Sequence, residues 1–264
     1  MKRKTFILLL TMLSIGIMSC SSYQKLLKSS DNELKYTKAL AYYEKGEYLR
    51  AQQLFDIILP FFKGTEKAEK ISFYNAYCYY KQHDYVLGAY YFKMFASNFS
   101  TSIYAEEAAY MTAYSNYLDS PRSSLDQTNT VDAISSLQLF INQYPKSERI
   151  ADCNKLIDEL RAKLEEKAIN IAMLYSKMSD FKASIVSLNN VLKEFPDTKS
   201  KEQVLFYLLQ SKYLYAVNSI SEKRQQRLTE ALDTYDELHA GFPVGEYTDK
   251  AMSIKKNIEK ALND

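Results

Sequence analysis

The chain has 264 residues and a formal net charge of +2 at pH 7, and so small an excess of basic side chains does not suggest binding to nucleic acid. Only six Gly and five Pro interrupt it, and alternating β-patterns are scarce, so the composition predicts an all-α fold of long regular elements. The chain contains 23 Tyr, 13 Phe and no Trp. Tyrosine joins an apolar ring to a polar tip, which suits half-buried helix faces and partner-binding grooves.

Residues 1–19 have the pattern of a bacterial lipoprotein signal peptide. A cationic start precedes an apolar stretch from Phe6 to about Ile17, which is too short to span ~30 Å of hydrocarbon. The stretch ends in Ile17-Met18-Ser19-Cys20, which resembles a lipobox. Cleavage before Cys20 would let its thiol take a diacylglycerol and its new amino group an acyl chain. A plain signal peptide with an incidental cysteine is the alternative, but an ordinary cleavage site requires a small residue where Ile17 stands.

The sequence after the cleavage site predicts the location. Removing residues 1–19 removes three cations and no acids, so the mature chain has one more acidic than basic side chain. By analogy with proteobacterial lipoproteins, Ser21 in place of Asp favours the outer membrane. No acidic run follows Cys20, which favours the periplasmic face. Residues 20–32 are then expected to be a lipidated tether.

Three segments share one internal pattern, in which an aromatic residue, a polar turn and a second aromatic residue precede a small residue and then a large apolar residue. The small residues are Ala51, Gly88 and Ser184, and the large residues four positions on are Phe55, Phe92 and Leu188. The pattern predicts helical hairpins, because the small residue lets two helices approach and the large residue fills the gap one turn later. Gly46 suits the left-handed conformation that ends the first helix.

The hairpins resemble tetratricopeptide repeats. We expect a solenoid of about five units at residues 33–63, 68–99, 102–145, 164–196 and 200–243, with a closing helix near 246–262. An insertion follows Ser120, and a long helix from about Glu148 to Met178 joins the third and fourth units. Residues 33–145, which contain the first three units, are the candidate peptide-binding half, and residues 146–264 contain the last two units and the closing helix.

The first helices of units one to three carry an aromatic stripe at positions i, i+4 and i+7. Such helices line the concave surface of a repeat array, so the stripe is a candidate groove for an apolar or aromatic peptide. The alternative is that these rings only pack between units. The candidate peptide-binding residues are Tyr36, Tyr43, Phe73, Tyr77, Tyr80, Tyr110, Tyr114 and Tyr117.

Catalytic, cofactor and metal-binding patterns are not found. His83 and His239 lie far apart in sequence, and no H-x-x-x-H, C-x-x-C or P-loop pattern occurs. The paired acids Glu106-Glu107 and Glu165-Glu166 are expected on solvated helix faces. Cys78 and Cys153 are expected to be small core residues, with a periplasmic disulfide as the alternative. A protein without enzymatic activity, and with no cofactor beyond the lipid on Cys20, is predicted.

The combination of lipobox, five repeats and insertion resembles the BamD (YfiO) family of outer-membrane assembly lipoproteins. The resemblance rests on the segment from Tyr117 to Gln127 and on Tyr144-Pro145-Lys146-Ser147, which look like the family's third-unit insertion and the motif after it. It implies a non-enzymatic scaffold of the β-barrel assembly (BAM) complex, anchored in the outer membrane by lipid. The implied partners are BamA and other BAM subunits, bound by the C-terminal units, and unfolded outer-membrane β-barrel proteins, bound by the N-terminal units.

Two other classes of lipoprotein remain open from the sequence. One is a different repeat adaptor, such as a secretion pilotin or a cell-envelope coordinator. The other is a solute-binding lipoprotein, which is disfavoured because such proteins are longer and use Trp to stack on sugars, and this chain has no Trp.

Overall fold

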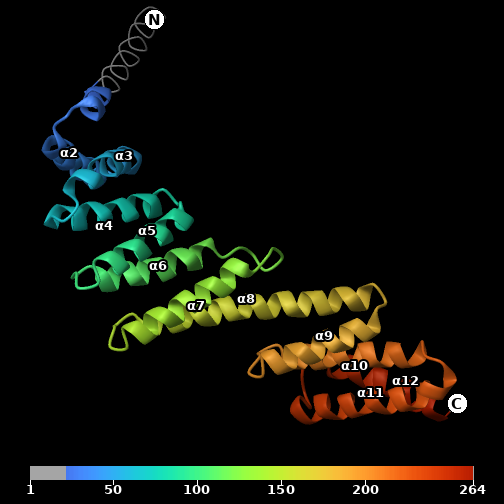
Figure 1. The fold of residues 1–264 in the computed structure, drawn as a ribbon. Helices are drawn as coiled ribbons and strands as arrows, with labels where there is room; N and C mark the ends of the chain where they lie inside the picture. The colour runs from blue at the N-terminus through green and yellow to red at the C-terminus, as the bar shows by residue number, and fades with distance from the viewer. Residues whose placement is uncertain (1–21, 264) are drawn as a thin grey trace, which may run out of the picture. The chain divides into compact units, whose positions relative to one another are not determined.

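The computed structural model describes residues 22–263, and every regular element within that range is helical. Residues 22–28 form a first helical segment, and the later helices run antiparallel to their neighbours along the chain (Figure 1). Their bounds are α2 (Asn32–Glu44), α3 (Tyr48–Ile58), the 3-10 turn η1 (Leu59–Phe62), α4 (Glu66–Lys81), α5 (Tyr85–Asn98), α6 (Ala105–Asp119), α7 (Thr128–Gln143), α8 (Ile150–Lys177), α9 (Phe181–Glu194), α10 (Lys201–Val217), α11 (Ser221–Gly241) and α12 (Thr248–Asn263).

The helices pair as the predicted hairpins, so the all-α, tetratricopeptide-like fold class is confirmed. The five pairs run from α2–α3 to α10–α11, and α12 is the closing helix. The expected long helix is α8. At the hairpin turns Gly46, His83 and Ser179 have φ of 76°, 62° and 63°, and only glycine adopts this left-handed region without a steric cost.

The small and large residues of the repeat pattern lie between packed helices, as predicted. Ala51 and Phe55 are fully buried, as are Ser184 and Leu188. At Gly88, a Cβ atom would lie 3.4 Å from the backbone nitrogen of Tyr80, so the glycine allows α5 to approach α4 closely. The large side chains fill the space beside these contacts.

Three of the hairpins have a hydrogen bond at equivalent positions. The turn after the second helix places a hydroxyl against a glutamate on the first helix: Ser102 donates to Glu69 at 2.5 Å, and Ser147 donates to Glu106 at 2.6 Å. In the fourth repeat Thr198 donates to Glu165 at 2.5 Å. Glu106 is exposed, as expected of a solvated helix face, and Glu165 is half-buried; each also accepts the hydrogen bond that joins the turn to the first helix of its hairpin.

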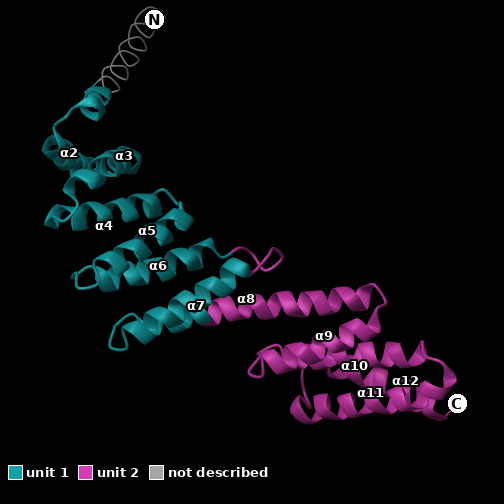
Figure 2. Ribbon diagram, in the orientation of Figure 1, with its two compact units in different colours: residues 1–120, 128–157 teal, residues 121–127, 158–264 magenta. Residues whose placement is uncertain are grey.

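The chain divides into two compact units, coloured separately in Figure 2. Within the described residues, unit 1 comprises 22–120 and 128–157, and unit 2 comprises 121–127 and 158–263. The division falls inside α8, beyond the expected boundary at 145/146, and the insertion loop belongs to unit 2. Each unit has its own apolar core. Among residues 22–263, no helix is long and apolar enough to cross a membrane.

The expected tether of residues 20–32 is partly folded. Tyr23 is only 6% exposed, and its hydroxyl donates to the Arg50 carbonyl at 3.0 Å and to Gln53 Oε1 at 2.9 Å. The Arg50 guanidinium lies 5.3 Å from the centre of the Tyr23 ring. Cys20 and the signal peptide lie outside the described residues. Three residues span at most ~11 Å, so a lipid on Cys20 would be held close to the first hairpin.

Candidate functional site

The eight residues of the predicted stripe, here called the aromatic face, all lie in unit 1 on α2, α4 and α6. Its seven tyrosines are half-buried, so each ring packs on the repeat and also meets solvent. Tyr110 stacks on Tyr114 with ring centres 5.7 Å apart and planes 9° apart, and Tyr114 stacks on Tyr117 at 5.8 Å and 15°. Three nearly parallel rings therefore form a ladder along α6.

The rings of α4 join this ladder. Tyr80 lies 6.4 Å from Tyr114 between ring centres, and Tyr77 lies 6.3 Å from Tyr80 with the two planes perpendicular. Tyr77, Tyr80 and the α6 ladder thus form one cluster built from two repeats.

Phe73 and Tyr36 occupy different positions from that cluster. Phe73 is 7% exposed and lies in the core, where its ring stacks on Tyr104 at 4.6 Å and contacts Tyr77 at 5.0 Å. It can support the aromatic face from beneath but offers little surface to a ligand. Tyr36 packs on Phe62 at 5.9 Å, away from the cluster.

A chain of polar contacts runs beneath the cluster. The Tyr77 hydroxyl donates a hydrogen bond to the Glu107 carboxylate. The Arg149 guanidinium also donates to this carboxylate and forms an ion pair with it. The Arg149 guanidinium lies 4.2 Å from the centre of the Tyr110 ring, which is a cation–π distance. Glu107 was expected to be solvated, and that expectation is wrong because it connects α4, α6 and the segment that enters α8.

Burial raises the pKa of four tyrosines of the face, Tyr43, Tyr77, Tyr80 and Tyr110, so these four stay neutral over the physiological pH range. Burial, and then the hydrogen bond to Glu107, raises the pKa of Tyr77. Burial also raises the pKa of Tyr43 and Tyr110, and in Tyr110 the nearby Arg149 opposes the shift. The face therefore offers apolar rings and neutral phenols, together with one guanidinium at its edge. This chemistry suits an aromatic or apolar peptide.

Arg149 and Glu107 were missed by reasoning from sequence, although a repeat signal could have found Arg149. The residue two positions after the turn hydroxyl lies flat on the first helix of its repeat. Tyr104 occupies this position in the second repeat and stacks on Phe73. In the third repeat Arg149 takes the place of the aromatic ring and lies over Tyr110, which adds a charge to the edge of the face.

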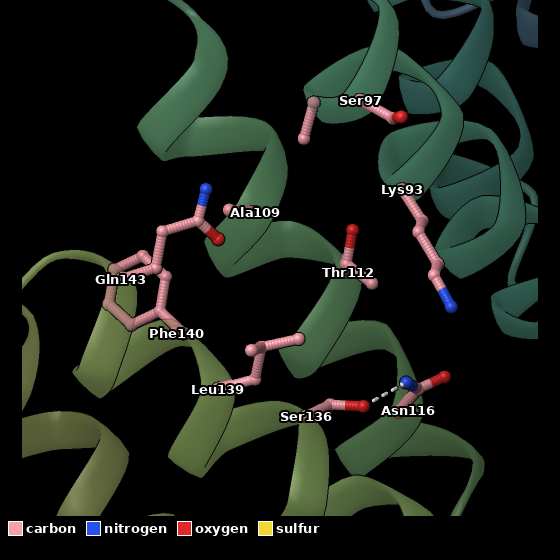
Figure 3. A pocket seen from close by; sticks show the side chains of 10 residues that line it. Lys93, Ser97, Ala109, Thr112, Asn116, Ser136, Leu139, Phe140 and Gln143 are labelled. Atoms are coloured by element: carbon pink, nitrogen blue, oxygen red, sulfur yellow. Dashed lines mark hydrogen bonds between the residues drawn. The ribbon is translucent and has the colours of Figure 1, made fainter. Parts of the chain in front are cut away.

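A hollow of unit 1 lies between α5, α6 and α7 (Figure 3). Its volume is about 250 Å³, and Lys93, Thr112, Asn116 and Leu139 are among its lining residues. Asn116 donates to Ser136 Oγ across it at 2.8 Å. Thr112 and Asn116 point away from the side of α6 that carries the tyrosine ladder. The hollow is therefore distinct from the aromatic face, and its lining is neutral except for Lys93.

Cys78 and Cys153 are both buried and free, which supports the core interpretation over a disulfide. Burial, and then the negative charge of Asp56, raises the pKa of Cys78 to about 12, so its thiol is unreactive. Within residues 22–263, no three His, Cys, Asp or Glu side chains are grouped to hold a metal ion.

Comparison with known proteins places the chain in a family. The family model YfiO, described as an outer membrane lipoprotein, matches residues 28–228, about three quarters of the chain. The comparison with curated proteins found no match. The matched range includes α2 to α10, and hence the whole aromatic face.

Proposed function

The chain belongs to the YfiO family of outer-membrane lipoproteins, and from that premise we propose that it is a lipid-anchored, periplasm-facing scaffold of the β-barrel assembly complex. In this proposal unit 1 binds unfolded outer-membrane β-barrel proteins through the aromatic face, and the C-terminal repeats bind BamA. The protein performs no chemical reaction on either partner. The family supports association with outer-membrane assembly, and the aromatic face supports the peptide-binding role.

The ladder of Tyr110, Tyr114 and Tyr117 is the observation that carries the peptide proposal. Stacked, half-buried rings on one helix face leave ring surface and hydroxyl groups for a ligand. Burying one aromatic side chain is worth roughly 1.5–3 kcal/mol. Two anchored aromatic residues would contribute about 3–6 kcal/mol, so micromolar affinity, which requires about 8 kcal/mol, would also need backbone and other side-chain contacts of the peptide.

The test uses the mature protein and a fluorescent peptide of alternating apolar and polar residues that ends in phenylalanine. The variants are Tyr77→Ala and Tyr114→Ala, and the matched control is Tyr90→Ala on α5, where the ring is 55% exposed and outside the aromatic face. We expect each face variant to weaken binding about tenfold or more, with Tyr90→Ala unchanged. Equal affinity for all four proteins, with folding verified by circular dichroism, would refute the peptide site.

The partner is tested by affinity purification of the tagged lipoprotein from detergent-solubilised outer membranes. BamA as the main co-purified protein supports the proposal. A secretin or a cell-envelope enzyme in its place would instead favour an adaptor of another kind, and a TonB-dependent transporter would favour nutrient uptake.

A further inference from the structure

The second half of α8 carries an apolar face that continues into solvent. Leu160, Leu164, Lys167, Ile171, Leu174 and Met178 follow one another at spacings of four and three residues, so they form one seam along the helix. Leu160 is fully buried and Leu164 is half-buried, whereas Ile171, Leu174 and Met178 are 40%, 54% and 67% exposed. Tyr175, 37% exposed, lies beside them.

Within unit 2, the insertion loop (residues 121–127) contacts the seam at Lys167, and the apolar residues of the seam beyond Lys167 are exposed. Lys167 is the polar residue of the seam, and its ammonium donates to the Leu125 carbonyl of the loop. The loop is held compact by Gln127, which is 7% exposed and donates to the carbonyls of Arg122 and Leu125 at 2.9 and 3.0 Å. Beyond Lys167 the apolar part of the seam is open. Ile171, Leu174, Tyr175 and Met178 are called the open α8 face below.

The other repeats show what normally covers this position. In the first helices of the second, third and fifth repeats, the residues equivalent to Leu174 are Cys78, Ser115 and Ser211, and each is fully buried. A small residue of the preceding second helix covers it. Ser184 of α9 lies 3.0 Å from Ser211 of α10 between hydroxyl oxygens, for example, and a Cβ on Gly88 of α5 would lie 3.6 Å from Ser115 Oγ of α6.

The fourth repeat departs from this rule in two ways at once. Its equivalent residue is a large and exposed leucine, whereas the equivalents in the second, third and fifth repeats, each preceded by a second helix, are small and buried. Ile171 is likewise 40% exposed, whereas its equivalent in α10, Leu208, is 2% exposed under α9. A face that is both more apolar and more exposed than its covered equivalents lacks the helix that covers it in the other repeats.

We infer that the open α8 face docks one amphipathic helix of a partner protein, in the manner in which α9 covers α10. The inference rests on the proposed function, since the partner is the BamA periplasmic region, and it specifies where and how that partner binds. The docking helix presents aliphatic residues to Ile171 and Met178 and a small residue opposite Leu174. Two helices of this fold approach closely only where at least one of the two facing side chains is small.

The extent of the face selects a single helix over a second copy of the chain. Four partly exposed side chains supply much less than the ~800 Å² per partner that a standard stable interface buries. One docked helix, by contrast, needs about two turns of apolar residues, which matches the span from Ile171 to Met178. The position is also continuous with the buried part of the seam at Leu160, so a docked helix would extend contacts that the protein already makes.

The test measures binding of the purified periplasmic domains of BamA to the mature protein by titration calorimetry. Leu174→Asp places a charge at the centre of the face, and Leu174→Met is the conservative variant. The control is Val186→Asp on α9, because Val186 is 53% exposed in the same unit but outside the face. We expect Leu174→Asp to weaken binding by about 100-fold, and the methionine variant and the control to bind within about threefold of the original protein.

The outcomes separate this inference from the proposed function. Equal binding by the original protein and by Leu174→Asp overturns the docking face and leaves the scaffold role standing. If the original protein does not bind BamA either, both fail. Sedimentation that shows a dimer of the original protein, abolished by Leu174→Asp, overturns the partner helix in favour of a second copy. Because Leu174 is exposed, the melting temperature of each variant should stay close to that of the original protein, and this is checked first.

Discussion

Glu107→Gln tests whether the contacts beneath the aromatic face form a single network. The change keeps an acceptor for the Tyr77 hydroxyl but removes the charge that pairs with Arg149. The Arg149 and Glu107 side chains are 36% and 29% exposed, so solvent screens the pair partly, and it should contribute up to about 1 kcal/mol. The hydrogen bond from Tyr77 weakens as well when its acceptor becomes neutral, which adds on the order of 1 kcal/mol.

We therefore expect Glu107→Gln to destabilise unit 1 by about 1–2 kcal/mol, with a coupling of about 1 kcal/mol in a double-mutant cycle with Arg149→Gln. Urea unfolding followed by tyrosine fluorescence measures both quantities. The reference pair is Lys255–Glu259 on α12, separated by 3.7 Å on one helix, where an exposed i,i+4 pair should couple by less than about 0.5 kcal/mol. A coupling at Glu107 and Arg149 no larger than this reference would show that the two residues merely lie close together.

Three further predictions concern the hairpin turns, the thiols and alkaline stability. Ser179→Gly should raise the free energy of unfolding by about 0.5–1 kcal/mol and Gly46→Ala should lower it by about 1–2 kcal/mol, because both positions have positive φ; thermal melts measure both. Cys78 and Cys153 are buried thiols, so a thiol reagent at pH 8 should modify them only after denaturant is added, and rapid reaction in the native state would contradict their burial. Burial holds the pKa of Tyr77 above the ordinary value of 10.0, so the unfolded chain ionises first and stability should fall above pH 10 by about 1.4 kcal/mol per pH unit for each such tyrosine. Tyr77→Phe should reduce that slope in urea titrations between pH 9 and 11, and an unchanged slope would contradict the assignment.

The docked position of Tyr23 bears on how the anchor works. With the Tyr23 ring buried against α3 and its hydroxyl bonded to Arg50 and Gln53, little free chain separates Cys20 from the first repeat. The anchor would then hold unit 1 close to the membrane, where barrel proteins are inserted. A lipidated cysteine followed by a long free chain would not restrict unit 1 in this way.

The repeat architecture was determined by the sequence alone because its signals are local. The spacing from Ala51 to Phe55 and from Gly88 to Phe92, and the polar turns before them, are set within single hairpins. Helix periodicity then brings each pair to one face. The same local logic places Tyr110, Tyr114 and Tyr117 on one stripe, and the structure stacks them as a ladder.

Tertiary structure decided which residues that look solvated are bonded, and which apolar residues are left uncovered. Glu107 looks like one more surface acid until α4 brings the Tyr77 hydroxyl to it and the turn before α8 brings Arg149. Leu174 looks like a core residue, since leucine on a helix stripe is usually buried, yet no described helix of unit 2 covers it and it is 54% exposed. Periodicity shows which side chains share a face of a helix. Whether that face meets another helix or water depends on contacts between segments distant in sequence, and these exist only in the folded chain.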